Sequence, residues 1–442
     1  MSKGSTSVTW RALLQPLTLS VMLALVTVQP LKASDDWGND SWNDDSWGAE
    51  ADTAPRWHGF LETAVGVRTD DDPVLPNDDL SLADLRAQLE ISDYVGESRY
   101  SLKADLYADG IEHGLHGELR EALLDLSPSE NTDLRIGQQI LTWGTGDLLF
   151  INDMFPKDWV SYFAGRDDQY LKAPSASAKF SYYNDKANLD LVWTPRFTSD
   201  RFIDGERFSY FNALDGQQAS VHLVPIDPED TPDNGELALR LYGTVDSTEW
   251  ALYAYRGFWK QPNAMTAGGE AYFSRLDTFG ASVRGNLGEG IANAEFGWYQ
   301  GEDSGGDDPR VPNDQLRVLF GYEQELVAKL TGSVQYYQEW IQDYGALTRT
   351  DGNSPYRPDE HRHVWTLRLT YRMLQDNLIL SWFNYWSPSD EDLFMRPSVS
   401  YRFDDNTSLV VGTNVFSGKK AHSFFGQFED ASSVYARLRY SF

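Results

Sequence analysis

The chain has 442 residues, with 37 Lys and Arg against 67 Asp and Glu, a formal net charge of −30 and no cysteine. The acidic balance excludes nucleic-acid binding, and the lack of cysteine excludes disulfide scaffolds, thiolate zinc sites and cysteine nucleophiles. A mean hydropathy of −0.48, with no apolar run long enough to span a bilayer beyond the N-terminus, excludes a helical membrane protein. Aromatic residues make up 14% of the chain, which is an unusually high share.

Residues 1–33 predict a secretory signal peptide. Lys3 and Arg11 precede a mostly apolar stretch over 12–28, and a cleavage point follows at Ala33. A basic start, a short apolar core and a small residue at the cut are typical of export signals. A single membrane anchor is the less favoured alternative, because the apolar stretch is short.

Residues 34–56 form an acidic segment in which Trp37, Trp42 and Trp47 recur among Asp, Asn, Ser and Gly. This spacing fits neither helix nor strand, and the composition favours a disordered periplasmic tail. The alternative is a docking tail, whose tryptophans insert into a periplasmic partner or into the protein's own lumen.

From residue 57 to residue 442 the apolar residues recur with a period of two. Over 237–245, for example, Leu237, Leu239 and Leu241 share one face and Arg240 lies on the other. Such alternation over about ten residues, repeated with turn residues between, indicates a transmembrane β-barrel. We expect eighteen strands, with sixteen as the alternative, over 57–68, 80–92, 99–109, 117–126, 134–140, 175–183, 188–195, 236–245, 249–258, 276–285, 291–300, 314–323, 329–340, 363–372, 377–386, 392–402, 407–416 and 433–442.

The links between these strands alternate between short and long, and the longest are 141–174, 196–235, 259–275 and 341–362. Strict alternation places the long links on one side of the sheet. The pattern predicts an all-β, antiparallel barrel of the bacterial outer membrane, with short periplasmic turns and long extracellular loops. An even number of strands puts both ends of the mature chain in the periplasm. The lipid bilayer and lipopolysaccharide are the surroundings that this placement implies.

Two segments resemble known families. The last strand ends in Tyr440-Ser441-Phe442, which together with the export signal resembles Gram-negative outer-membrane proteins. The resemblance implies that the assembly machinery recognises the final strand through Phe442. The stretches 134–147 and 151–158 are similar to large substrate-conducting porins, including alginate-export-like barrels, in which a Gly-x-Gln strand leads into a long folded-in loop. In those porins a basic residue is expected at the position that Gln138 occupies here. The resemblance therefore implies no particular substrate.

The segment 141–174 is predicted to fold into the barrel and to narrow it. It is too long for a hairpin link, and its aromatic residues offer more apolar surface than an exposed loop leaves in water. The alternative is an external lid. We expect Trp143 and Trp159 to anchor the segment to the wall, and the opening to be lined by Asp147, Asp153, Asp158, Arg166 and Asp168.

Strand alternation also predicts which charged side chains face the lumen. The expected inward bases are Lys103, Arg135, Lys179, Arg240, Arg284, Arg317, Arg368, Arg372, Arg396, Arg402, Arg437 and Arg439, and the expected inward acids are Glu62, Glu90, Asp105, Glu121, Asp190, Glu295, Glu323 and Glu339. Arginines gathered in the last strands predict a basic wall suited to carboxylate- or phosphate-bearing solutes. The alternative is that Glu and Asp neutralise them across strands.

Catalytic and metal motifs are nearly absent from the sequence. It has no P-loop, no H-E-x-x-H pattern and no G-x-S-x-G elbow, so we do not expect an enzyme. We expect no cofactor; Ca²⁺ bound by Asp147, Asn152, Asp153 and Asp158 is a weak alternative, because their spacing matches no known calcium loop. The sequence therefore predicts a channel for small polar or anionic solutes. An export or lipid-transfer component is the second reading, and an outer-membrane enzyme the third.

Overall fold

The structure is a computed structural model that describes residues 57–75 and 79–442. The predicted signal peptide over 1–33 and the predicted tail over 34–56 lie outside the described residues. The described residues belong to one compact unit.

Most of the described chain forms one antiparallel sheet. Its strands are β1 (Trp57–Arg68), β2 (Leu80–Val95), β3 (Ser98–Asp109), β4 (Gly114–Ser129), β5 (Thr132–Gln139), β6 (Ser175–Tyr182), β7 (Asn188–Thr194), β10 (Glu236–Val245), β11 (Thr248–Phe258), β14 (Arg275–Leu287), β15 (Gly290–Gln300), β16 (Gln315–Val327), β17 (Leu330–Ile341), β18 (His361–Met373), β19 (Leu378–Ser387), β20 (Asp392–Met395), β21 (Ser398–Arg402), β22 (Thr407–Gly418) and β23 (Ser433–Ser441). Because β20 and β21 are two parts of one strand, these nineteen segments of the described chain make eighteen barrel strands.

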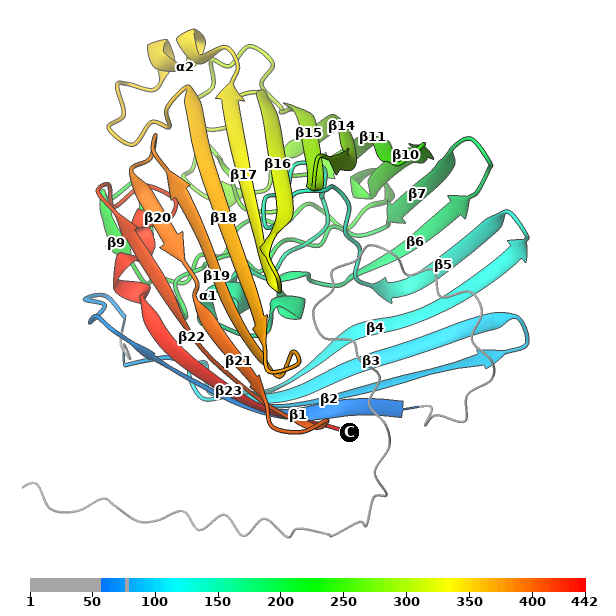
Figure 1. Cartoon of the computed structure of the whole chain (residues 1–442). Helices are drawn as coiled ribbons and strands as arrows, with labels where there is room; N and C mark the ends of the chain where they lie inside the picture. The colour runs from blue at the N-terminus through cyan, green and yellow to red at the C-terminus, as the bar shows by residue number, and fades with distance from the viewer. Residues whose placement is uncertain (1–56, 76–78) are drawn as a thin grey trace, which may run out of the picture. The chain divides into compact units, whose positions relative to one another are not determined.

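The sheet closes on itself. Each strand pairs with its neighbour in sequence, and β23 pairs with β1 from Phe60↔Ser441 to Arg68↔Ser433. Figure 1 shows this order, with the red last strand beside the blue first one. The predicted all-β, eighteen-stranded barrel is confirmed. Closure satisfies the backbone groups of every strand, which a bilayer requires because its hydrocarbon offers no hydrogen-bond partner.

The two ends of the barrel differ. At one end, which we call the turn side, the links are short; Gly96 and Glu97, for example, join β2 to β3. The described chain also enters β1 and leaves β23 at this end. The other end, the loop side, carries the long links, and only 110–113 and 388–391 are short there.

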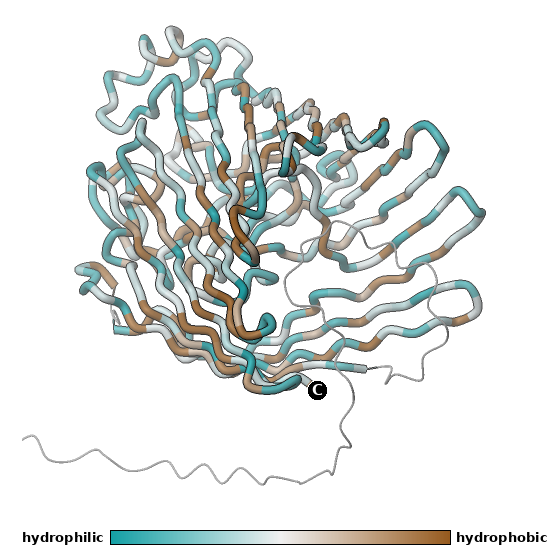
Figure 2. Tube along the Cα trace, in the orientation of Figure 1, coloured by the Kyte–Doolittle hydropathy of each residue, from teal (hydrophilic) through white to brown (hydrophobic). Residues whose placement is uncertain are grey.

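The outward face of the strands is apolar. Leu61, Val65, Leu252, Phe320 and Leu438 are among the many large apolar side chains that point outward and are about half exposed. Figure 2 shows brown residues along the strands and teal ones at the turns and loops. An apolar band on the outside of a closed barrel is the surface that faces lipid.

One strand departs from the prediction. We expected a single strand over 392–402, but β20 ends at Met395 and β21 begins at Ser398. Pro397 lacks a backbone N–H, so it cannot donate to the ladder, and the break frees Arg396 to point into the barrel.

The remaining elements lie in the long links. They are α1 (Trp159–Ala164), α2 (Tyr344–Thr350), the short 3-10 turns η1 (Asp168–Leu171), η2 (Pro232–Asn234) and η3 (Gly426–Ala431), and the small hairpins β8 (Tyr210–Asn212) with β9 (Gln217–Ala219) and β12 (Ala264–Met265) with β13 (Ala271–Tyr272). Among the described residues, none of the helices has the length and apolar character needed to cross a membrane.

Candidate functional site

The segment 141–174, which links β5 to β6, lies inside the barrel. One of its contacts with the wall is the carboxylate of Glu295, an inward residue of β15. This carboxylate accepts hydrogen bonds from the backbone N–H groups of Thr145 and Gly146 and from Asn152 Nδ2 at 2.9 Å. The carboxylate of Glu295 therefore binds two parts of the segment, the backbone at 145–146 and the side chain of Asn152.

Two wall glycines let the segment come close. Gly280 on β14 and Gly297 on β15 pair with each other and face inward. A Cβ atom at Gly280 would lie 1.7 Å from Asn152 Oδ1, and one at Gly297 would lie 2.6 Å from Ile151 Cγ2. The absence of side chains there leaves a hollow, and the segment fills it.

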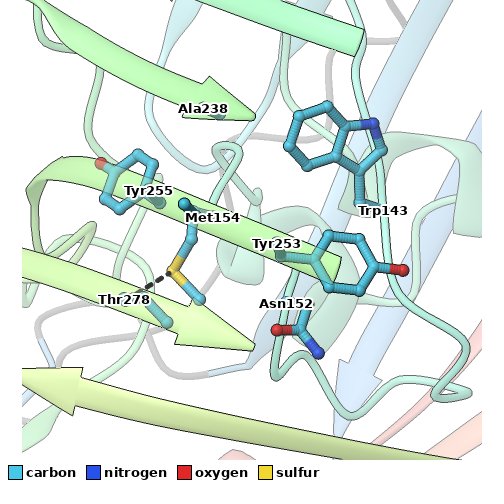
Figure 3. A pocket seen from close by; sticks show the side chains of 8 residues that line it. Trp143, Asn152, Met154, Ala238, Tyr253, Tyr255 and Thr278 are labelled. Carbon is cyan, nitrogen blue, oxygen red and sulfur yellow. Dashed lines mark hydrogen bonds between the residues drawn. The ribbon is translucent and has the colours of Figure 1, made fainter. Parts of the chain in front are cut away.

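Trp143 packs against the wall of β11, as Figure 3 shows. Its ring lies 5.0 Å from that of Phe155 and 6.1 Å from that of Tyr253. Met154 points to Thr278, whose hydroxyl donates to the sulfur at 3.9 Å. The cavity between Trp143, Met154 and the strands β11 and β14 is about 10 Å³, which is too small for a solute. The segment therefore packs closely on the wall at this place.

Asp147 binds the opposite wall through Arg368 on β18. The guanidinium donates from Nε at 2.5 Å and from Nη2 at 2.9 Å, so the pair is bidentate. Gln335 on β17 also holds the Asp147 backbone, accepting from its N–H and donating to its carbonyl, both at 2.8 Å. The Asp147 side chain remains 36% exposed, so water reaches this pair.

Asp158 does not line an opening. It is 2% exposed and caps α1, accepting from Ser161 N and Ser161 Oγ at 2.7 Å each. It also pairs with Arg201 at 3.1 Å. An acid directly before a helix is a preferred N-cap, because its oxygens satisfy unpaired backbone N–H groups, and here this local role replaces the predicted one.

Asp153 is also buried, at 6% exposure, and pairs with Lys157 at 2.9 Å. The prediction that Asp153 lines the opening is therefore corrected in the same way. Nor do the four candidate calcium ligands gather. Each of the four side chains binds a different protein partner, so their oxygens do not converge on one point; the residues are Asp147, Asn152, Asp153 and Asp158.

α1 docks on an aromatic cluster formed by Phe163 with Phe394, Phe416, Phe425 and Phe428, whose ring centroids lie 5.3–6.4 Å from that of Phe163. Trp159 stacks on the same helix 5.9 Å from Phe163, and its Nε1 donates to Asp200 at 2.9 Å. Trp159 thus anchors the segment to the neighbouring loop as well as to the aromatic cluster.

Arg166 follows α1 and is a buried clamp. It donates to Asp84 on β2 at 2.6 and 3.2 Å and to Asp109 on β3 at 2.9 Å. Burial alone would lower the pKa of Arg166, but the carboxylates of Asp84, Asp158 and Asp109 raise it above its ordinary value. Arg166 is 6% exposed, so it holds the segment and does not line an opening.

Asp167 joins the segment to β23. Its carboxylate accepts from Arg437 at 2.9 Å and from Arg439 at 3.0 Å, and Arg439 also binds Glu62 of β1 at 2.8 Å. Burial alone would raise the pKa of Asp167, but Arg439 and Arg437 lower it well below its usual range. The three elements are therefore linked by charge at the closing seam of the barrel.

Asp168 pairs with Arg396 at 2.6 Å, and Arg396 also donates to the Arg166 carbonyl at 2.8 Å. The Asp168 side chain is 64% exposed although it lies within the barrel. An exposed carboxylate at that position marks water-filled space beside the segment.

The arginine wall, which we define as Arg368, Arg396, Arg437 and Arg439, is thus matched by carboxylates. The partners are Glu62 on β1 and three acids of the inward segment, Asp147, Asp167 and Asp168. A basic wall was predicted; the structure shows four guanidinium groups beside four carboxylates, with little net charge. Three of the partners come from the segment and not from neighbouring strands.

The remaining predicted arginines lie on the barrel wall. Arg317 on β16 pairs with Glu339 of β17 at 3.2 Å, and Arg372 on β18 is partly buried nearer to the turn side. Within residues 57–75 and 79–442, Arg240 and Arg284 have no ion pair, and Arg240 lies over the ring of Tyr242 at 4.2 Å. Among the described residues, Asp190 and Glu249 stand opposite them in the strand register but form no ion pair with them, so both guanidinium groups keep donors for a passing anion.

Several residues of this network were missed as site residues. Strand alternation identified Glu62 and Glu295 as inward acids, but no sequence signal connected them to the segment. Asp167 stands between Arg166 and Asp168, yet nothing in the sequence separates its role from theirs. Asp84 and Asp109 face inward by the same alternation that marks their neighbours.

The closed barrel with an apolar exterior and an inward segment defines an outer-membrane β-barrel of the porin type. Residues 105–442 match the family described as "Protein of unknown function (DUF1302)", and the chain belongs to this family. No curated protein matches the sequence.

Solved structures share the fold. OccK2 (OpdF) of Pseudomonas aeruginosa, solved in complex with glucuronate, has a TM-score of 0.52 at 11% identity, over 88% of this chain and 97% of that one. OccAB3 of Acinetobacter baumannii has a TM-score of 0.52 at 10% identity, over 87% and 98%. OccK11 (OpdR) of Pseudomonas aeruginosa has a TM-score of 0.51 at 10% identity, over 87% and 95%. At these identities the likeness concerns the fold.

Proposed function

We propose that this protein is an outer-membrane channel, not an enzyme, and that small polar or anionic solutes pass through its mixed-charge lumen beside the segment 141–174. The observation that carries the proposal is the carboxylate of Asp168, which lies inside the barrel and is 64% exposed although it pairs with the buried guanidinium of Arg396. A segment that filled the lumen completely would bury this carboxylate, whereas a constriction leaves it in contact with water.

The anionic preference rests on Arg240 and Arg284, since the arginine wall is neutralised. A guanidinium without a carboxylate partner offers its donors to a carboxylate or phosphate. That a protein of this fold, OccK2, was solved with glucuronate fits a solute of this kind.

Planar bilayers with the purified protein test the proposal. We expect discrete conductance steps in KCl and a reversal potential shifted weakly toward anion selectivity across a salt gradient. Replacing Arg240 and Arg284 together by Ala should abolish the anion preference. Arg310→Ala, which removes an exposed loop arginine already paired with Asp308, is the matched control and should leave selectivity unchanged. Folded protein without conductance would refute the channel.

Both ends of the mature chain are proposed to face the periplasm, and the loop side to face the exterior and lipopolysaccharide. The ends of the described barrel share the turn side, which also presents Phe442 for recognition by the assembly machinery. Because the chain has no cysteine, single substitutions report topology cleanly. In intact cells an impermeant maleimide should label Asn353→Cys in a long link and not Glu97→Cys in a short turn.

A further inference from the structure

A cleft of about 170 Å³ opens beside α1 among the long links. Trp159 and Phe163, four residues apart on one face of α1, form one side. Phe424 and Phe428 form a second side, and Ile203 and Leu223 of the link between β7 and β10 form a third. An open space of this size admits one ring of six carbon atoms.

The polar side chains that border the cleft each have at least one protein partner, and Gln261 Nε2 donates to Asp200 at 3.3 Å. Trp159 Nε1 donates to Asp200, and the Tyr210 hydroxyl donates to the Val221 carbonyl at 3.0 Å. Gln427 accepts from Phe211 N at 3.2 Å and donates to the Phe424 carbonyl at 3.1 Å. The cleft also presents polar atoms, so its lining is amphipathic: the aromatic and aliphatic side chains can contact an apolar ring, and the polar atoms beside them suit a solute that carries hydroxyl groups.

The cleft is built on the same segment that borders the proposed pathway. α1 supplies Trp159 and Phe163, and the same chain continues directly into Arg166, Asp167 and Asp168, which bind the wall.

We propose that the cleft is a recognition site for the apolar ring of an uncharged or amphipathic solute, such as an aromatic glycoside, and that it selects such solutes for passage. This inference rests on the proposed channel and names one class among the polar solutes proposed for it, the uncharged solutes that carry an apolar ring. The acidic loop side, with Asp204 and Glu206 on the same link, does not favour an anionic group at the entrance itself.

Calorimetry on the full-length protein in lipid nanodiscs tests the site with two water-soluble probes that differ only in the ring. Phenyl β-D-glucoside should bind at least about tenfold more tightly than methyl β-D-glucoside, because only the first buries apolar surface in the cleft. Equal affinity of the two probes would overturn the inference.

Two matched variants test whether the preference for the phenyl glucoside arises in the cleft. Leu223→Asp places a carboxylate in the cleft and should reduce the difference between the probes to about threefold or less. Val221→Asp adds the same charge two residues away, on a side chain that is 74% exposed and outside the cleft, and should preserve the preference. Ile203→Asn supplies a second cleft variant should Leu223→Asp fold poorly. An unaltered preference in both cleft variants would place the binding elsewhere and refute the site.

Potassium chloride conductance of the same samples separates the two proposals. A conducting protein without a ring preference would sink the recognition site and leave the channel standing. Ring-dependent binding without conductance would sink the channel, and with it the transport role of the cleft.

Discussion

The pair of Asp147 with Arg368 is a clamp that water can reach. Both oxygens of the carboxylate accept from the guanidinium, and the two side chains are 36% and 26% exposed. Solvent screening reduces the stabilising free energy of such an ion pair below that of a buried pair, to about 1 kcal/mol.

Arg368→Ala should therefore loosen the segment without unfolding the barrel. We expect more frequent transitions between conductance levels, measured by single-channel recording. The matched control is Arg256→Ala, since Arg256 binds Asp277 with the same bidentate geometry, at 2.9 Å for each bond, on the outside of the barrel. Equal channel noise in the two variants would show that the pair does not restrain the segment.

Gly165 ends α1 in the left-handed region, at a φ of 88°, directly against the ring of Tyr435. A Cβ atom would lie 2.5 Å from Tyr435 Cδ1. Gly165→Ala should cost about 2–3 kcal/mol in unfolding free energy, measured by urea titration in lipid vesicles, because it adds a clash to the backbone penalty. Gly352→Ala, with a φ of 66° and no atom within 4 Å, should cost only the backbone penalty of about 1 kcal/mol. Equal losses would exclude the contact with Tyr435 as the cause.

At the scale of elements, the segment 141–174 is a separable part held by charges and aromatic packing. Deleting residues 146–165 removes the Asp147 clamp and α1 but leaves the barrel strands intact. We expect conductance to rise severalfold, because the space that the segment occupies becomes water. Deleting 345–352, which includes most of α2 on the loop side, is the control for shortening a link and should change conductance little. A folded 146–165 deletion with wild-type conductance would mean that the segment does not limit flow.

The pH dependence of the segment follows from Asp167. Arg439 and Arg437 lower the pKa of Asp167 in the folded protein. The ionised carboxylate therefore stabilises the attachment of the segment to β23 at every pH above the ordinary pKa of an aspartate, near 4. This stabilisation is lost as the pH falls through the lowered pKa. Conductance should stay constant from about pH 7 to pH 5 and rise only in stronger acid. Asp167→Asn should show the raised conductance already at pH 7. A transition centred near neutral pH would assign the control of the segment to another group.

The strands were predictable because alternation leaves a signal within each one. Over 237–245 the apolar face can be read from the sequence directly, and Pro397 marks the only interruption that the prediction overlooked in the barrel strands of the described chain. The partners of the segment were not predictable. Asp147 and Arg368 are far apart in the sequence, and strand patterns fix which way a side chain faces but not what crosses the lumen to meet it.

Local preference also misled the prediction at particular residues. Asp153 and Asp158 look like lumen acids because they are charged and belong to a loop. Each instead satisfies a nearby group, the Lys157 ammonium in one case and the first turn of α1 in the other. Such short-range partners are available to any loop acid, and only the folded chain shows whether it uses them.

At the scale of the whole molecule, the apolar exterior predicts a depth-dependent cost of charge. Leu367 on β18 faces outward in the middle of its strand and is 37% exposed. Leu367→Arg should cost about 2–4 kcal/mol in unfolding free energy in vesicles, because the guanidinium meets hydrocarbon. Leu115→Arg, at the loop-side end of β4, should cost about 1 kcal/mol or less. Equal costs at the two sites would argue against a membrane band centred on the strands.

The seam between β1 and β23 makes the order of events in biogenesis matter. Phe442 exchanges two backbone hydrogen bonds of 2.9 Å with Gly59 and packs on Trp57, so the residues that follow β23 meet the beginning of β1. Until β23 is in place, β1 offers an unpaired edge that can associate with other chains. Contacts between such distant parts of a polypeptide form slowly, and a prematurely ended product can never form this one. Closure of this barrel therefore depends on β23, and a product truncated before this strand should be removed by proteolysis before it enters the bilayer.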